Sequence, residues 1–190
     1  MSGWRKTAMG LVGIGLIGLG LIALLRLGYG ALRRASVEPY VAAASERYGV
    51  DAGLIRAVIW RESRFRPRER GGAGERGLMQ VTEAAAWEWA VAEGIEPFRF
   101  ETVQEPGPNV LAGTWYLARA LAYWSDRDDP VPFALAEYNA GRTHALRWAA
   151  EAEDAAAFME AITYPGTRRY IRQVLQRWRR APGPGSLPPD

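Results

Sequence analysis

The sequence has no cysteine and a single histidine, His144, among its 190 residues. Without cysteine the chain has no disulfide, no thiolate zinc site, no cysteine nucleophile and no lipid anchor on a thiol. One histidine leaves a Ser-His-Asp triad only formally possible and excludes a metal site built from several histidines. We interpret His144 as a residue of the surface or of a helix start. The chain is therefore expected to work without metal or cofactor.

Lysine is nearly absent as well, because Lys6 is the only one and every other cationic side chain is arginine. The formal net charge of +3 is unevenly distributed. Residues 1–36 carry five cationic side chains and no acid, whereas residues 37–190 carry 19 arginines and 21 acids. The larger part is therefore slightly acidic, and its composition does not favour nucleic-acid binding.

A run without charge occupies residues 7–25, "TAMGLVGIGLIGLGLIALL". Its 19 residues approach the roughly 20 that span a bilayer, whereas the apolar core of a signal peptide is about 7–15 residues long. The run predicts an uncleaved transmembrane helix, with "GYG" at 28–30 as a weak alternative cleavage site. Cationic residues flank both ends, so the positive-inside rule does not fix the orientation.

The rest of the chain shows helical periodicity and no sustained alternation typical of strands. It predicts an all-α single domain over residues 37–181, behind an anchor and flank at 1–36, with a disordered Pro/Gly-rich tail at 182–190. The segment 96–109 contains three prolines and is interpreted as irregular. Helices are expected at 36–48, from Asp51 to Pro67, from Thr82 to 94, and at 110–124, 133–138, 143–152, 154–162 and 167–180.

Glu62 continues the apolar stripe formed by Ile55, Val58 and Ile59, so we expect its side chain to point toward the core. Burial disfavours the charged carboxylate and raises its pKa, as a general acid near neutral pH requires. The position also fits a structural glutamate paired with an arginine at the helix end. The arginines in reach are Arg56, Arg64 and Arg66.

Ordinary glycosidases use two carboxylates about 5–9.5 Å apart, but no partner for Glu62 is evident. Glu69, Glu75 and Glu83 are near in sequence, and each has a charged or loop setting that favours a solvated side chain. Either a partner comes from a distant segment, or the mechanism needs a single acid and base.

Uncharged polar groups recur at three further places. "GLMQ" places the Gln80 amide beside apolar side chains after a glycine-rich loop, a combination that suits sugar binding. "AEYNAG" places Tyr138 and Asn139 at a helix end before Gly141. Tyr170 borders the apolar stripe of the last helix. Taken alone, these features also fit a loop-to-helix junction, a helix cap and a core-edge tyrosine.

Taken in order, these segments resemble the catalytic domain of soluble-type lytic transglycosylases, relatives of goose-type lysozyme. The resemblance covers about residues 41–179. The matching segments are "ES" at 62–63, "GLMQ" at 77–80, "NVLAGTWYL" at 109–117, "AEYNAG" at 136–141, and Thr167 with Tyr170.

The resemblance implies a lysozyme-like fold and cleavage of peptidoglycan glycan strands between N-acetylmuramic acid and N-acetylglucosamine. Glu62 would protonate the glycosidic oxygen and then take the proton of the muramoyl 6-hydroxyl, leaving a 1,6-anhydromuramoyl end without a second carboxylate. Ser63 and Gln80 would lie in the sugar cleft, Tyr138 and Asn139 along its wall, and Tyr170 beside Glu62. Such a substrate would place the domain on the periplasmic side of a bacterial cytoplasmic membrane, held by residues 7–25.

The sequence departs from the family pattern at Glu83 and Ala85, where the family has Pro and Thr, and at Gly166, where it often has Glu. Three alternatives remain: a hydrolytic muramidase similar to goose-type lysozyme, a membrane-anchored peptidoglycan-binding protein without catalysis, and a small hub that assembles through its anchor helix. The sequence does not identify a protein partner.

Overall fold

The computed structural model describes Leu25 and residues 28–180, which fall into two compact units, one ending at Ser36 and the other beginning at Val37. The predicted anchor, residues 7–25, lies outside the described residues except for Leu25, and the tail at 182–190 lies outside them too. None of the helices in the described part is both long and apolar enough to cross a membrane.

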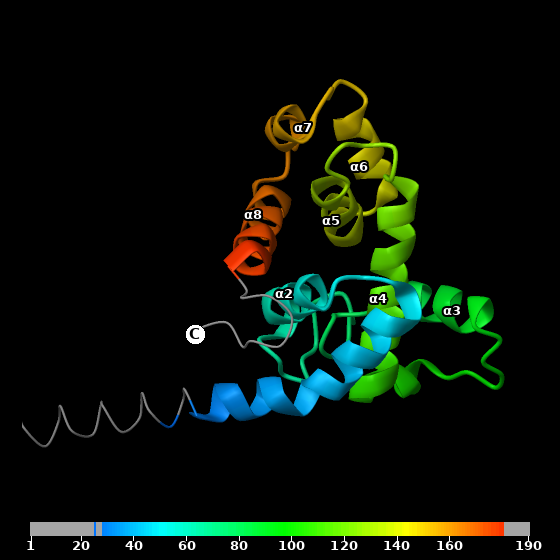
Figure 1. Ribbon diagram of the computed structural model, residues 1–190. Helices are drawn as coiled ribbons and strands as arrows, with labels where there is room; N and C mark the ends of the chain where they lie inside the picture. The colour runs from blue at the N-terminus through cyan, green and yellow to red at the C-terminus, as the bar shows by residue number, and fades with distance from the viewer. Residues whose placement is uncertain (1–24, 26–27, 181–190) are drawn as a thin grey trace, which may run out of the picture. The chain divides into compact units, whose positions relative to one another are not determined.

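The second unit is built of helices, as predicted, and Figure 1 shows their arrangement. Within residues 37–180 the only β-type pairing is a pair of isolated bridges, Arg70 with Arg76 and Arg76 with Val81. A helix over residues 37–48 opens the unit. The elements that follow are α2 (Ala52–Ser63), α3 (Glu83–Ala92), the 3-10 helix η1 (Phe100–Gln104), α4 (Pro106–Tyr123), α5 (Val131–Ala140), α6 (Arg142–Ala149), α7 (Ala155–Ala161) and α8 (Pro165–Arg180).

Asp51 caps α2 as predicted, since its carboxylate accepts a hydrogen bond from the Leu54 N–H at 2.9 Å. The same oxygen accepts a bond from the Trp178 indole N–H at 2.7 Å, which ties the end of α8 to the start of α2. The predicted end of α2 at Pro67 is too late. Arg64 and Phe65 adopt left-handed φ values of 53° and 58°, so the helix ends at Ser63.

The prolines of the segment 96–109 start a helix instead of only interrupting one. α4 begins at Pro106, four residues before its predicted start, and Phe100–Gln104 form η1 where no regular structure was expected. Proline is compatible with the first turn of a helix because the N–H groups there have no intrahelical acceptor. The prediction of a helix here is therefore correct, and only its start was misplaced, because the prolines were expected to interrupt a helix and instead begin one.

α8 holds the two halves of the unit together, because it packs against both α2 and α5, while α5 also packs against α4 and α6. α3 and η1 cover α4 at the other end (Figure 1). Apolar side chains from all these helices form one core, in which the rings of Phe133 and Phe158 stack with their centroids 4.0 Å apart. This arrangement brings Tyr170, near the C-terminus, next to the end of α2.

The chain between α2 and α3 is irregular, and Asn109 of α4 holds it in place. The fully buried Asn109 side chain accepts a bond from the Met79 N–H at 2.8 Å and donates to the carbonyls of Arg76 and Val103, both at 2.7 Å. Gly77 has φ of 76°, and a Cβ there would lie 2.3 Å from the Asn109 amide nitrogen. Only glycine therefore fits this approach.

We predict that Asn109→Ala lowers the free energy of unfolding by about 3 kcal/mol, because it leaves buried backbone groups of the turn without partners. Urea unfolding measures the change. Asn139→Ala is the matched control, since Asn139 is exposed and makes no hydrogen bond with the described residues, and surface changes stay within about 0.5 kcal/mol. Equal changes in the free energy of unfolding for the two substitutions would show that the Asn109 side chain does not hold the turn in place.

Candidate functional site

Glu62 lies in the last turn of α2, half-buried, between the core and the loop that follows. Loss of hydration on burial is the main cause that raises its pKa, from an ordinary 4.5 to about 7. Glu75 raises the pKa further through like-charge repulsion, whereas Tyr170 and the Arg61 guanidinium lower it. The carboxyl therefore exchanges its proton near neutral pH, as a residue that acts as acid and then base requires.

Two tyrosines from different helices flank Glu62. Tyr170 of α8 is 1% exposed, and burial, with the nearby Glu62 charge, raises its pKa well above the usual value. Tyr138 of α5 shows the same direction of pKa shift for the same two causes. The Tyr170 hydroxyl lies close enough to the Glu62 carboxyl that their interaction lowers the pKa of Glu62 and helps to raise that of Tyr170.

The "GLMQ" turn is fastened to α5. The Tyr138 hydroxyl donates to the Met79 carbonyl at 2.8 Å, and the Gln80 amide donates to the Gly77 carbonyl at 2.8 Å. Gln80 has φ of 48°, a left-handed conformation that costs a residue with a side chain about 1–2 kcal/mol. The turn is thus held in a strained form that presents the Gln80 side chain.

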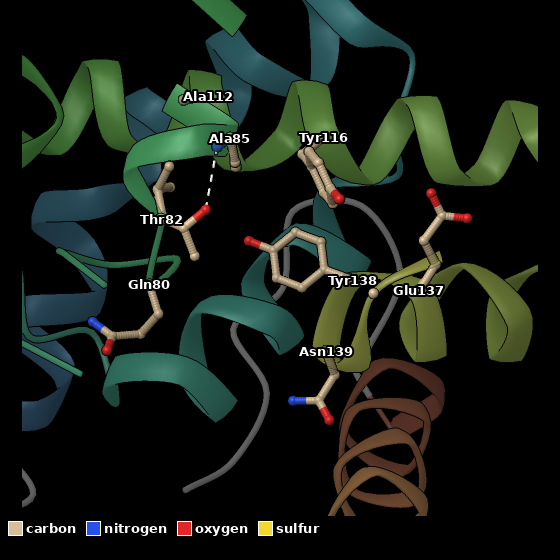
Figure 2. A pocket seen from close by; sticks show the side chains of 11 residues that line it. Gln80, Thr82, Ala85, Ala112, Tyr116, Glu137, Tyr138 and Asn139 are labelled. Carbon is tan, nitrogen blue, oxygen red and sulfur yellow. Dashed lines mark hydrogen bonds between the residues drawn. The ribbon is translucent and has the colours of Figure 1, made fainter. Parts of the chain in front are cut away.

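A hollow of about 230 Å³ begins at Gln80 and continues along α3, α4 and α5. In the view of Figure 2, Gln80 lies to the left of Tyr138, Asn139 lies below it and Tyr116 above it, and the Glu137 carboxylate is turned away. The rings of Tyr116 and Tyr138 pack edge to face, with their centroids 5.9 Å apart. Aromatic faces with two side-chain amides beside them suit a saccharide, whose rings have apolar faces and polar rims. Glu62 and Tyr170 are not among the lining residues, but Glu62 is close enough to the lining residue Tyr138 to raise its pKa.

The structure thus brings together four of the six predicted site residues and places the other two differently. Glu62, Gln80, Tyr138 and Tyr170 form one group, and Asn139 borders the same hollow while its side chain is exposed. Ser63 is 1% exposed, and its hydroxyl donates to the Ile59 carbonyl at 3.1 Å. The Ser63 hydroxyl therefore points back along α2.

Glu75 is the acid whose setting the sequence did not reveal. Expected to be solvated, it is half-buried, accepts a bond from the Ala73 N–H at 3.0 Å, and lies against Gly71 beside the Gln80 amide. Glu69 is paired with Arg66 at 2.8 Å, and Glu83 is exposed in the first turn of α3. The glycines around Glu75 were the available signal, because they let the loop fold back over its carboxylate.

An ion pair between a buried carboxylate and a partly exposed arginine, next to the hollow, also went unrecognised. Glu137 is 1% exposed and accepts bonds from Arg142 at 2.7 and 2.9 Å and from the Trp124 indole at 2.9 Å. A buried carboxylate is tolerable only with such partners. The pair joins α5 to α6 and so fixes the helix end that carries Tyr138 and Asn139.

The departures from the family pattern leave the helix starts intact. Thr82 caps α3, accepting a bond from the Ala85 N–H at 3.2 Å (Figure 2), although Glu83 replaces the usual proline. α8 begins at Pro165 without an acid in its first turn. No group of three or more metal-binding side chains occurs within the described ranges.

Comparison with known proteins finds a match to the family model described as the transglycosylase SLT domain over residues 39–159. A membrane-bound lytic murein transglycosylase F from Desulfosudis oleivorans is 38% identical over 109 residues, which cover 56% of this chain and 22% of that protein. A soluble lytic murein transglycosylase from Salmonella typhimurium is 32% identical over 123 residues, which cover 63% of this chain and 19% of that protein.

The solved structures include the lytic transglycosylase Slt from Pseudomonas aeruginosa, in an inactive variant that has glutamine in place of a glutamate. The match has a TM-score of 0.67 and 25% identity and covers 74% of this chain and 23% of that one. The fold is therefore that of the lysozyme-like helical domain, as predicted. This chain spans about a fifth of the length of the relatives given above.

We predict that Glu62→Gln stabilises the protein at pH 8 by about 2 kcal/mol and has little effect at pH 4. The folded-state pKa is raised from 4.5 to about 7, so the wild type loses stability as pH rises through that window, at about 1.4 kcal/mol per pKa unit at most. Glutamine does not ionise and avoids the loss. Urea unfolding at both pH values measures it, and a stabilisation equal at pH 4 and 8 would show that Glu62 is not desolvated.

Proposed function

Because the chain belongs to the transglycosylase SLT domain family, we propose that it is a peptidoglycan lytic transglycosylase with Glu62 as its single general acid and base. The observation that carries the proposal is the half-buried Glu62 carboxyl, with a pKa of about 7, close to the buried Tyr170 and to Tyr138, which lines the hollow. A fixed carboxyl that gains and loses a proton near neutral pH serves both halves of the reaction.

In the first step the protonated Glu62 donates to the glycosidic oxygen, and the bond from that oxygen to the muramoyl anomeric carbon breaks. In the second step the Glu62 carboxylate takes the proton of the muramoyl 6-hydroxyl, and its oxygen bonds to the anomeric carbon. Glu62 ends protonated, and no water is consumed. Tyr170, whose hydroxyl interacts favourably with the Glu62 charge, would stabilise the carboxylate between the steps.

The substrate contacts follow from the hollow. Gln80 and Asn139 offer amides to hydroxyl and N-acetyl groups, and Tyr116 and Tyr138 offer ring surface to the sugar faces. Ser63 is proposed to support the cleft without contacting the sugar through its hydroxyl, because that hydroxyl donates to the Ile59 carbonyl within α2. The hydrogen bonds of Asn109 would fix the turn that carries Gln80, and the Glu137–Arg142 pair would fix the helix end that carries Tyr138 and Asn139. The two sides of the hollow would then keep a fixed separation, which catalysis by precisely positioned groups requires.

The proposed location is the periplasmic face of a bacterial cytoplasmic membrane, with residues 7–25 as a single-pass anchor. The 19 residues without charge support a membrane helix. A peptidoglycan substrate supports an outer orientation, and one relative is itself described as membrane-bound.

Glu75 favours one second candidate, a hydrolytic muramidase, because it is a half-buried carboxylate near Glu62. Hydrolysis would need a carboxylate to take a proton from an attacking water. Glu75→Gln would then abolish cleavage, whereas transglycosylation predicts that cleavage persists with a changed pH dependence.

We predict that Glu62→Gln lowers kcat on purified peptidoglycan at least about 100-fold, the lower range for loss of a general acid. The measurement is release of soluble fragments. Glu69→Gln is the matched control, because Glu69 is paired with Arg66 and is expected to keep near-normal activity. Equal activity of Glu62→Gln and wild type would refute the assignment of the acid.

We predict opposite shifts of the alkaline limb of the activity–pH profile in two neighbouring variants. Glu62 acts first as an acid, so activity falls as pH rises through its pKa. Glu75 raises that pKa and Tyr170 lowers it. The limb therefore moves to lower pH in Glu75→Gln and to higher pH in Tyr170→Phe. Shifts in the same direction, or no shift in either variant, would contradict the proposal that Glu75 and Tyr170 set the pKa of Glu62 in opposite directions.

A further inference from the structure

Charge is segregated along the second unit. Residues 165–180, which form α8, contain six arginines and no acid, whereas residues 37–164 contain 13 arginines and 20 acids. The helix is therefore strongly positive, and the rest of the unit is negative. Such asymmetry orients a protein near a charged surface, because one side is attracted and the other is repelled.

The positive charge gathers on the outer face of α8. At about 100° per residue, Arg169, Arg172, Gln176, Arg179 and Arg180 share one side of the helix, and all five side chains are exposed. We call these five residues the arginine face. The opposite side buries apolar residues where α8 packs against α2 and α5.

Acids of the same unit neutralise the arginine face only in part. Arg172 lies 3.9 Å from Glu160 and Arg179 lies 3.5 Å from Asp129, and all four side chains are well exposed, so each pair is weak. Arg169 and Arg180 have no ion pair with any acid of residues 28–180. The face therefore remains cationic and open to solvent.

We propose that the arginine face docks α8 on the anionic lipid surface of the membrane that holds the proposed anchor. Guanidinium groups bind phosphate oxygens bidentately, and clustered cations near an anionic leaflet add their attractions. Tyr170 lies on the buried side of α8, close to Glu62 of α2, so docking through the arginine face turns the proposed catalytic group away from the lipid. The docking rests on the proposed anchor and not on the proposed catalysis.

A lipid surface fits this charge pattern better than an anionic polymer. The arginines form one stripe on one straight helix, and the negative remainder of the unit would repel a polyanion that wrapped around it. A planar surface contacts the stripe alone.

The absence of cysteine allows a direct test in the full chain, reconstituted in bilayer nanodiscs. A fluorescent label is attached through Gln176→Cys on the arginine face, or through Val91→Cys on α3 as control, a position that is 77% exposed. Lipids with a headgroup nitroxide quench labels that lie at the surface. We expect several-fold stronger quenching at position 176 in phosphatidylglycerol-rich discs than in phosphatidylcholine discs, and none at position 91.

The quenching is expected to fall in about 1 M salt, where the screening length is about 3 Å. It is also expected to fall when Arg169, Arg172, Arg179 and Arg180 are all changed to Gln, while helicity and peptidoglycan cleavage stay normal. Equal quenching in both lipids, or quenching that persists in the Gln variant, overturns the docking. A chain that does not enter the discs overturns the anchor and the docking with it, whereas loss of cleavage alone bears only on the catalytic proposal.

Discussion

The contact between α2 and α8 removes the Glu62 carboxyl from water, and the rest of the site depends on that desolvation. Burial is the largest cause of its pKa of about 7, and α8 also supplies Tyr170, whose hydroxyl opposes the shift. The link between Asp51 and Trp178 closes the other end of the same helix pair. The chain thus keeps an unfavourable buried acid because the surrounding core is large enough to tolerate it.

The backbone shows comparable strain beside this acid. Among residues 28–180, three residues other than glycine have a positive φ: Arg64, Phe65 and Gln80. Arg64 and Phe65 follow Glu62 closely in sequence, and Gln80 borders the hollow. Asn109 and Tyr138 hold the turn that carries Gln80 through three side-chain contacts with its backbone or flank. Strain that a surrounding structure enforces is typical of sites arranged to meet a ligand.

Helical patterning predicted the all-helical class and the partial burial of Glu62, because both depend on local spacing. The stripe of Ile55, Val58 and Ile59 is buried as expected and carries Glu62 inward. Contacts between distant segments were not predictable: Glu75 is covered because its loop folds back, and Glu137 because Arg142 and Trp124 meet it. Pro106 was misjudged because the same residue can end or begin a helix, depending on register.

Mass spectrometry of the fragments released from purified peptidoglycan tests the central claim most directly. If Glu62 is the single acid and base, the muramoyl ends are 1,6-anhydro sugars, lighter by one water than hydrolytic ends, and they carry no label when cleavage proceeds in water enriched in oxygen-18. Reducing muramoyl ends that carry the heavy oxygen would contradict the account and assign the second step to water.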